Sequence, residues 1–317
     1  MSNKEYRPTL AQLRTFVTVA EKRHFGTAAT KLGISQPSLS QALVALESGL
    51  GIQLIERSTR KVIITAAGEE LLPYAKATLE AAEAFLSHAR GTVGTLTGPL
   101  NIGIIPTAAP YILTELLAAG QEKYPDLEPR FVEGQTTELI HMLRDGNIDV
   151  ALIAMPSDAQ GLVDMPLYTE DFAVVVPAHH ELAGRDDLTL DDLQKLELLL
   201  LDDGHCLRDQ VLDLCRLADI NPSEASSTLT RATSLTTIMR LVAGGLGSTL
   251  VPETALNPEL EGLGLSTSRF SDNVTAQREM GLVYRSSSTR AGEFAQLGEL
   301  ITQSFERSRA PEAPRQS

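Results

Sequence analysis

Hydrophobic positions at helical spacing open the chain. From Leu10 to Ala20 the apolar residues recur at intervals of three and four, which is typical of an amphipathic helix. Residues 9–48 are predicted to form consecutive short helices, residues 49–65 a turn with two short strands, and residues 67–95 one long helix. This opening third therefore predicts a small helical domain followed by an extended helical connection.

From Leu100 onwards, short apolar runs alternate with amphipathic stretches. The runs predicted as strands are Leu100–Ile105, Leu127–Val132, Asp149–Ala154, Phe172–Val176, Leu198–Leu201, Ser248–Val251 and Met280–Tyr284. Helices are predicted between most of them. Alternation of strands and helices indicates an α/β domain with a largely parallel sheet.

Composition narrows the class of protein. With 43% hydrophobic and 21% charged residues in 317, the chain can build packed cores. No apolar run reaches the roughly 18 residues of a membrane span, and the first residues are polar, so neither a span nor a signal peptide is expected. Two cysteines exclude a disulfide-stapled secreted scaffold. The expected location is the reducing cytoplasm.

Charge is unevenly distributed along the chain. Residues 1–66 hold nine Lys and Arg against four Asp and Glu, a net charge of +5, whereas the whole chain carries −14. The remaining residues therefore carry −19. A basic head on an acidic body lets the head approach phosphates while the body is repelled from them.

The basic head has the pattern of a helix-turn-helix. Gly33 permits a turn of positive φ after a first helix, Ser35 can cap the next helix, and Pro37 falls in its first turn. Amides and hydroxyls at the exposed start of the second helix can read base edges in the major groove. An ordinary helical hairpin with solvated basic residues is the alternative. The residues predicted to contact DNA, including a basic wing, are Ser35, Gln36, Pro37, Ser38, Gln41, Arg57, Arg60 and Lys61.

A longer run of residues makes the resemblance specific. Residues 28–40 read Ala-Ala-Thr-Lys-Leu-Gly-Ile-Ser-Gln-Pro-Ser-Leu-Ser, and Leu46-Glu47, Leu50-Gly51, Leu54-Ile55-Glu56-Arg57 and Thr65-Ala66-Ala67-Gly68 follow. Together they resemble the signature of LysR-type transcriptional regulators over nearly all of residues 9–70. The resemblance implies a winged helix-turn-helix, a long dimerisation helix and a periplasmic-binding-protein-like regulatory domain of two α/β subdomains, an α/β protein overall.

The same resemblance implies a domain plan and partners. The plan is a DNA-binding domain at 1–66, a linker helix and hinge at 67–97, a regulatory domain at 98–306 and a loose tail at 307–317. Its subdomains would cover about 98–168 with 276–306, and about 169–275. The implied partners are a double-stranded DNA operator, further copies of the chain in a dimer and a tetramer, and RNA polymerase, with no membrane.

The predicted linker helix carries a hydrophobic seam. Its members alternate at spacings of three and four over three heptads: Leu72, Ala75, Leu79, Ala82, Leu86, Ala89 and Val93. Such a seam can pair two chains, and Leu72, Leu79 and Leu86 are its large members. Packing of the stripe on its own domain is the alternative.

Three predicted strands of the body end in hydroxyl residues that can cap the following helix. They lie at Ile105-Pro106-Thr107, Gln135-Thr136-Thr137 and Ala232-Thr233-Ser234. Helix N-termini that converge beyond the carboxyl ends of parallel strands form a polar pocket. We therefore expect a small-ligand pocket there, although ordinary capping explains each residue taken singly.

Two cysteines nine residues apart are the chemical feature of the body. Cys206 is predicted at a helix start, beside His205 and one turn from Arg208, so its thiol should ionise more easily than a free cysteine of pKa about 8.5. Within a continuous helix, Cys215 would lie about 13.5 Å away on the opposite face. A disulfide needs Cα atoms within about 7 Å, so a bridge requires the helix to unfold. Core filling by both cysteines stays open, whereas zinc is disfavoured because no second Cys/His pair has ligand spacing.

Several segments of the body resemble the peroxide-sensing members of the LysR family. They are residues 104–107, 135–136, 204–210, 231–235 and 278–285, together with Cys215. The resemblance implies that Cys206 is the peroxide-reactive thiolate, that Cys215 is its disulfide partner and that no cofactor takes part. Thr107, Thr136 and His205 would surround the peroxide, with Arg278 and Asp209 nearby.

The sequence thus predicts a peroxide-sensing, DNA-binding transcriptional regulator that controls oxidative-stress defence genes and is not an enzyme. One alternative is a LysR-type regulator that responds to a small organic ligand in the cleft between the subdomains. Another is a thiol peroxidase, although a turnover enzyme needs no helix-turn-helix.

Overall fold

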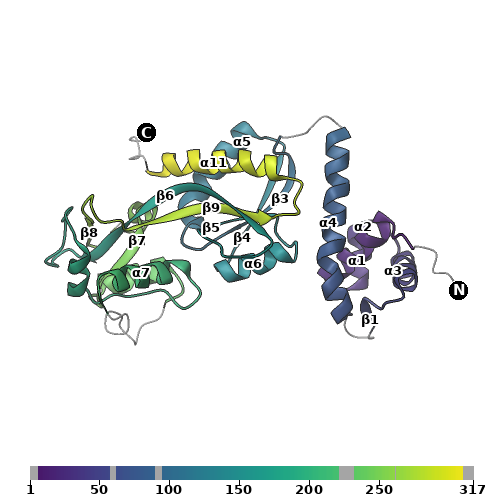
Figure 1. Ribbon diagram of the computed structural model, residues 1–317, viewed down its shortest axis with the longest axis horizontal. Helices are drawn as coiled ribbons and strands as arrows, with labels where there is room; N and C mark the ends of the chain where they lie inside the picture. The colour runs from purple at the N-terminus through teal and green to yellow at the C-terminus, as the bar shows by residue number, and fades with distance from the viewer. Residues whose placement is uncertain (1–5, 58–61, 90–94, 221–231, 261, 310–317) are drawn as a thin grey trace. The chain divides into compact units, whose positions relative to one another are not determined.

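The computed structural model describes residues 6–57, 62–89, 95–220, 232–260 and 262–309 (Figure 1). The chain forms two compact units. The first holds residues 1–94 with the short segments 144–147 and 287–291, and the second holds the remainder. Among the described helices, none is both long and apolar enough to cross a membrane.

The first unit is built from helices and a two-stranded hairpin. Its elements are α1 (Leu10–Lys22), α2 (Phe25–Leu32), α3 (Gln36–Leu50), β1 (Ile55–Arg57), β2 (Val62–Ile64) and α4 (Ala66–Ala89). Local sequence signals set the helix ends. Thr9 and Gln12 form a capping box at the start of α1, Gly33 ends α2 at φ +65°, and the Ser35 hydroxyl caps α3. The predicted helix-turn-helix is confirmed.

Leucines of α3 hold the first unit together. Leu39, Leu43 and Leu46 are fully buried and pack against Phe16 of α1 and Leu54 before the hairpin. Burial of one such side chain contributes about 1.5–3 kcal/mol to folding. Because the stripe faces inward, the opposite side of α3 is left to solvent.

The seam on α4 divides between two environments. Leu72, Ala75 and Leu79 pack against the hydrophobic core of the first unit itself. Leu86 and its neighbour Phe85 are 43% and 72% exposed. Self-packing therefore accounts for the first half of the seam. Its last member, Val93, lies outside the described residues, as do Arg60 and Lys61 of the predicted wing.

The second unit is built on a mixed seven-stranded sheet in the order β4-β3-β5-β9-β6-β7, with β8 paired to β6. The strands are β3 (Gly98–Ile104), β4 (Leu127–Glu133), β5 (Val150–Ala154), β6 (Leu162–Pro177), β7 (Thr249–Pro252), β8 (Leu265–Arg269) and β9 (Gln277–Arg285). The helices are α5 (Ala109–Lys123), α6 (Thr136–Arg144), α7 (Cys206–Leu217), α9 (Leu235–Ala243), α10 (Leu256–Leu260) and α11 (Ala291–Arg309), with 3-10 turns η1 (Leu190–Lys195) and η2 (Glu253–Ala255).

Two long strands make the sheet mixed. Only β4, β3 and β5 run parallel, whereas β6 and β9 pair antiparallel with each other and with their neighbours. The expectation of a largely parallel sheet is therefore wrong. Leu198–Leu201 is also not a strand, since it makes only isolated bridges to Ser248 and Ala232. Figure 1 shows β6 and β9 running through the whole second unit, with α5 and α11 on one face of the sheet and α6 on the other.

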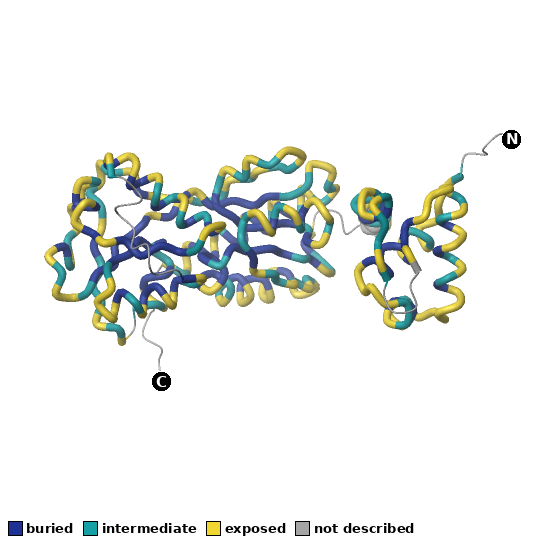
Figure 2. The backbone as a smooth tube through the Cα atoms, turned by 90° about the horizontal axis from the view of Figure 1, so that it is seen from below, coloured by how far each residue is buried: buried dark blue, intermediate teal, exposed yellow. Residues whose placement is uncertain are grey.

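The second unit has two separate hydrophobic cores. Core I gathers side chains of β3, β5, β9, α5 and α11, and core II gathers the end of β6, β7, α7 and α9. The buried strands appear dark blue between exposed segments in Figure 2. The predicted limits of the two subdomains stay a prediction, and β6 and β9 are the elements that both halves share.

Candidate functional site

Loops from both cores meet at a small polar cavity of about 120 Å³. The predicted convergence is confirmed in part: Thr107 and Ser234 line the cavity, and Glu133 at the end of β4 joins them. Thr136 does not line it, and Ser234 follows an isolated bridge at Ala232 and not a strand. The lining residues are Pro106, Thr107, Pro110, Tyr111, Glu133, Leu201, His205, Thr233, Ser234, Leu235 and Thr236. A water molecule occupies about 30 Å³ in the liquid. The cavity therefore suits a few molecules of that size, whereas organic ligands usually fill pockets of about 300–1,000 Å³.

The three hydroxyl residues do not play the same part. Ser234 caps α9 by accepting from the Thr237 amide at 3.3 Å, as expected. Thr107 caps nothing, since α5 begins after Ala108 without a side-chain bond. Thr136 is the first residue of α6, and its Oγ1 is buried without a hydrogen-bond partner among the described residues. A buried hydroxyl in that state is ready to bind a small polar molecule.

Thr107 is instead bonded to a buried arginine. Arg278 Nη1 donates to Thr107 Oγ1 at 2.9 Å, and Nη2 donates to the Thr107 carbonyl oxygen at 3.0 Å. On its other side Arg278 pairs with Glu170, which is equally buried. Arg278 does not line the cavity, so it stands behind Thr107 rather than beside the predicted ligand.

Cys206 begins α7 and directly follows His205, which lines the cavity. The prediction that a helix starts here is confirmed, with His205 at the N-cap position. Burial lowers the pKa of His205, and the Asp202 carboxylate opposes this shift. The imidazole is therefore neutral at pH 7. It can assist Cys206 as a hydrogen-bond partner but not as a positive charge.

The loop that precedes Cys206 lies close to Gln135. Gly204 has φ +94°, and a Cβ atom there would lie 2.3 Å from Gln135 Oε1. Gln135, from the loop before α6, also donates to the Asp203 carbonyl oxygen at 3.5 Å. The left-handed φ favours glycine at position 204, and Gln135 links the loop that leads to Cys206 to the segment before α6.

Arg208 is turned away from the thiol. Its Nε pairs with Asp203 at 3.0 Å, and its Nη1 donates to the Leu201 carbonyl oxygen at 3.0 Å. The positive charge that the sequence placed near Cys206 is thus partly neutralised by a carboxylate. Asp209 is exposed in the first turn of α7 and does not line the cavity.

Cys215 lies in a different environment. It is fully buried in core II, and burial raises the pKa of its thiol. Both cysteines are free, and α7 is continuous between them. Because a continuous helix separates their Cα atoms by about 13.5 Å, this structure is a reduced form that has to unwind before a bridge can form.

Two glutamates behind the cavity lining make contacts that were not predicted. Glu170 pairs with Arg278 and accepts from the Thr254 amide at 3.0 Å. Glu259 accepts from Tyr111 Oη at 3.1 Å and from Thr236 Oγ1 at 2.8 Å, which ties α5 to α9 and α10. Glu170 follows Thr169 and precedes Asp171 in β6, so its sequence neighbourhood did not mark it as a buried charge, and its partner lies 108 residues away.

Two family profiles match the chain. The LysR substrate binding domain matches residues 94–306, and the bacterial regulatory helix-turn-helix protein of the lysR family matches residues 10–69. The chain belongs to the LysR family of transcriptional regulators.

Individual relatives of this LysR-type regulator are peroxide sensors by name. The "Probable hydrogen peroxide-inducible genes activator" of Mycobacterium avium is 48% identical over 301 residues, which cover 95% of this chain and 96% of the relative. An H2O2-bound mutant of OxyR from Corynebacterium glutamicum is 64% identical with a TM-score of 0.70, over 96% of this chain and 95% of that chain. Full-length mutant OxyR from Pseudomonas aeruginosa is 32% identical with a TM-score of 0.82, over 98% and 100%.

These relatives make the chain an OxyR homologue, a peroxide-inducible and redox-switched transcriptional regulator of the LysR family. It binds DNA through its helix-turn-helix. It is a regulator and not an enzyme, so the thiol peroxidase alternative is wrong. The other alternative was a regulator that detects a small organic ligand. The relatives favour hydrogen peroxide as the signal instead.

Four of the side chains predicted to contact DNA are exposed on α3. Gln36, Pro37, Ser38 and Gln41 are exposed along α3. The hydroxyls of Ser35 and Ser38 lie 2.8 Å apart and bond to each other. Arg57 lies in β1, but its side chain, like Arg60 and Lys61, is outside the described part of the chain.

The hairpin of the regulator is anchored to the recognition helix by one carboxylate. Glu47 Oε1 accepts from the backbone amides of Leu54 and Ile55 at 2.9 and 3.0 Å. A carboxylate that accepts two backbone hydrogen bonds fixes the direction in which the chain leaves α3. Glu47 therefore sets the position of the wing relative to the residues that face DNA.

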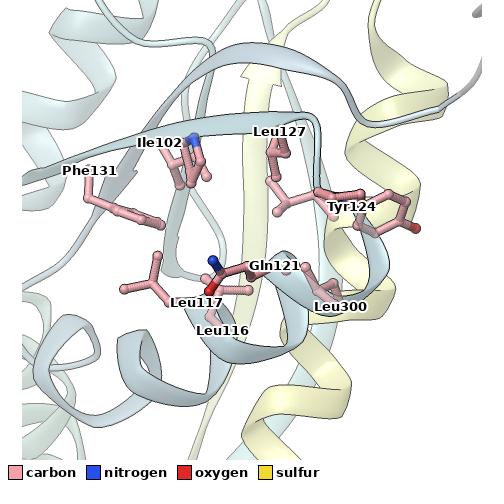
Figure 3. Close-up of a pocket in the computed structure, with 12 residues that line it drawn as sticks. Ile102, Leu116, Leu117, Gln121, Tyr124, Leu127, Phe131 and Leu300 are labelled. Carbon is pink, nitrogen blue, oxygen red and sulfur yellow. The ribbon is translucent and has the colours of Figure 1, made fainter.

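A larger cavity of about 400 Å³ lies elsewhere in the regulator. Figure 3 shows apolar side chains of α5 and β4 facing one another across it, with Gln121 among them. Every residue that lines it belongs to the half of the second unit around core I. Among the described residues, it shares no lining residue with the polar cavity, and neither cysteine lines it.

Proposed function

We propose that hydrogen peroxide signals by oxidising Cys206 at the polar cavity and that Cys215 then closes a disulfide with it. The observation that carries this proposal is the position of Cys206, at the start of α7 and directly after the cavity residue His205, while Cys215 is buried in core II. Cys206 is half-buried next to a cavity residue, whereas Cys215 is enclosed, so Cys206 is the more accessible of the two thiols.

The chemistry follows from that arrangement. The Cys206 thiolate attacks one oxygen of peroxide, an S–O bond forms as the O–O bond breaks, and the departing hydroxide takes a proton to become water. The sulfur is oxidised by two electrons to a sulfenic acid. The Cys215 thiolate then displaces hydroxide from that sulfenic acid, which forms the S–S bond and a second water.

Hydroxyl groups around the cavity are suited to hold the peroxide. We assign Thr107 and the unpartnered hydroxyl of Thr136 to peroxide binding, with His205 as a neutral hydrogen-bonding neighbour. Arg278 supports Thr107 from behind. Asp209, exposed in the first turn of α7, stays a predicted neighbour of the peroxide.

Oxidation should act on DNA through α7. A Cys206–Cys215 bridge cannot coexist with the continuous helix, so about two turns have to unwind and Cys215 has to leave core II. We propose that this rearrangement changes how the regulatory units pair, and with it the spacing of the DNA-binding heads in a dimer or tetramer. The proposed setting is the cytoplasm, with operator DNA and RNA polymerase as partners and oxidative-stress defence genes as targets.

The test is peptide mapping of the full-length chain under non-reducing conditions, with dose-matched DNA footprinting. Peroxide should give a 206–215 bridge and a shifted footprint in the wild type. Cys206→Ser should abolish the shift, and Cys215→Ser should accumulate the sulfenic acid. A normal footprint shift in Cys206→Ser, or a shift without the bridge, would falsify the proposed switch.

A further inference from the structure

Arg278 and Glu170 form an ion pair that is cut off from solvent. The two residues are direct partners in the pairing of β6 with β9, and their side chains are 0% and 1% exposed. Arg278 Nε and Nη2 both donate to Glu170 Oε2, at 2.9 and 2.7 Å. An apolar pair of similar size is often at least as stable as a buried ion pair. The fold by itself therefore does not require these charges here.

Both oxygens of Glu170 are engaged. While Oε2 binds Arg278, Oε1 accepts from the backbone N–H of Thr254 at 3.0 Å and from the Thr254 hydroxyl. Glu170 cannot turn without losing several hydrogen bonds, and the arginine that it binds is held in one orientation. The carboxylate thus connects η2, through Arg278, to the cavity.

The fixed arginine determines which way the Thr107 hydroxyl can bond. Arg278 Nη1 donates to Thr107 Oγ1, and an arginine has no acceptor to offer in return. A hydroxyl has one hydrogen and two lone pairs. Because a lone pair of Thr107 is already used by Arg278, its hydrogen remains for an acceptor, and Thr107 lines the cavity.

We propose that Glu170 is a positioning residue for the reduction of peroxide, acting through Arg278 and Thr107. This inference rests on the proposed oxidation of Cys206. As the thiolate attacks and the O–O bond breaks, negative charge develops on the departing oxygen before it takes a proton to form water. A Thr107 O–H group, aligned and polarised by Arg278, donates to that oxygen and stabilises the transition state. Glu170 contributes by keeping Arg278 aimed at Thr107.

The test compares two reagents on the same thiol. In a Cys215→Ser background, the rate at which peroxide converts Cys206 to sulfenic acid is measured by mass spectrometry. The rate of alkylation by iodoacetamide is measured in parallel, because its leaving iodide needs no hydrogen-bond donor. Glu170→Gln should slow the peroxide reaction about tenfold to a hundredfold, less than the roughly hundredfold to thousandfold loss when a transition-state donor itself is removed. It should leave alkylation and its pH profile unchanged, which a general loss of structure would not.

A matched control breaks a different Glu–Arg contact. Glu253 binds Arg269 and Arg309 near the surface, one residue before Thr254, and touches neither Arg278 nor the cavity. Glu253→Gln should leave both rates unchanged. If Glu170→Gln does not fold, Glu170→Asp replaces it, since it keeps the charge but withdraws the carboxylate by one methylene. Glu170→Asp should still slow the peroxide reaction selectively.

The decisive comparison is a double-mutant cycle. If Glu170 acts through Thr107, then in a Thr107→Val background the Glu170 substitution should cost little more. Independent, multiplying effects would overturn the proposal, as would an unchanged peroxide rate or an equal loss of both reactions. Failure of the proposed function is distinguishable: peroxide would then leave Cys206 unoxidised in the Cys215→Ser parent itself, and both proposals would fall.

Discussion

Cys206 and Cys215 share one helix but pack into different hydrophobic cores. Cys206 is half-buried against core I, whereas Cys215 is completely enclosed in core II. A bond between them therefore cannot form by a change of rotamer. Formation of the disulfide has to draw the Cys215 side chain out of core II. On a chain-entropy model, the disulfide that closes this ten-residue loop stabilises the protein by only about 2.7 kcal/mol.

This separation predicts that peroxide exposes α7. Hydrogen exchange of the backbone amides between residues 206 and 217 should become faster in the oxidised protein, because the helical hydrogen bonds and the packing of Cys215 are lost together. Exchange in α11, whose buried side chains pack in core I, serves as the internal control. A disulfide-bonded protein whose α7 stays protected would contradict the unwinding.

The pKa of His205 predicts a loss of stability in mild acid. Burial lowers its folded-state pKa below the ordinary value of 6.5, so below about pH 6.5 the unfolded chain binds the proton more readily than the folded chain. The unfolding free energy should therefore decrease as the pH is lowered below about 6.5, by at most about 1.4 kcal/mol per pH unit from this group.

The measurement is urea unfolding of the reduced protein between pH 5 and 7.5, roughly spanning that pKa. His205→Gln should flatten the dependence, and the exposed His141→Gln should retain it. A His205→Gln profile that falls as steeply as the wild type would show that other groups dominate.

The exposed face of α3 predicts base recognition by Gln41. Removal of its amide in Gln41→Ala should weaken binding to the cognate operator by about 1–3 kcal/mol and relax the preference at one base pair. Binding to unrelated DNA should change little, because phosphate contacts are kept. Gel-shift titration measures both, with Ser48→Ala, exposed near the end of the same helix, as the control. Equal losses on both DNAs would reject base readout by this residue.

The exposed end of α4 predicts self-association. Leu86 is exposed beside Phe85, so Leu86→Asp should place a charge in a contact between two chains and lower both the assembly state and operator affinity. Ala81→Asp, exposed on the same helix, adds the same charge away from the seam. Light scattering at micromolar concentration measures the outcome. A wild type that remains a 34.2 kDa monomer would rule out the dimer.

Residues close together in the sequence determined the architecture of the head. Thr9, Gly33, Ser35 and Pro37 act on the backbone within one helical turn, and the buried leucines of α3 follow one helical period. Such signals need no knowledge of the rest of the fold. The start of α7 at Cys206, the strand that ends shortly before Thr107 and the strand that contains Val150 were predictable for the same reason.

Tertiary structure alone decided the contacts that join distant segments. The hydrophobic seam on α4 has the same sequence whether it packs within the first unit or between two chains. Only the structure shows that Leu79 packs against the core of the first unit. An apolar run in the sequence also does not show whether its strand pairs parallel or antiparallel with a neighbour. The antiparallel pairing of β6 with β9 could therefore not be predicted. Arg208 was near Cys206 in the sequence, yet it pairs with Asp203.

The same limit applies to the cavity. The sequence placed Cys206, His205 and the hydroxyl residues at or near predicted helix starts, and only the resemblance to peroxide-sensing LysR regulators implied that they share one site. The sequence could not pair Glu170 with Arg278 across 108 residues, nor assign the two cysteines to different cores. Electrostatic pairing and burial depend on distance in space, which for residues far apart in the chain is set only when the sheet assembles.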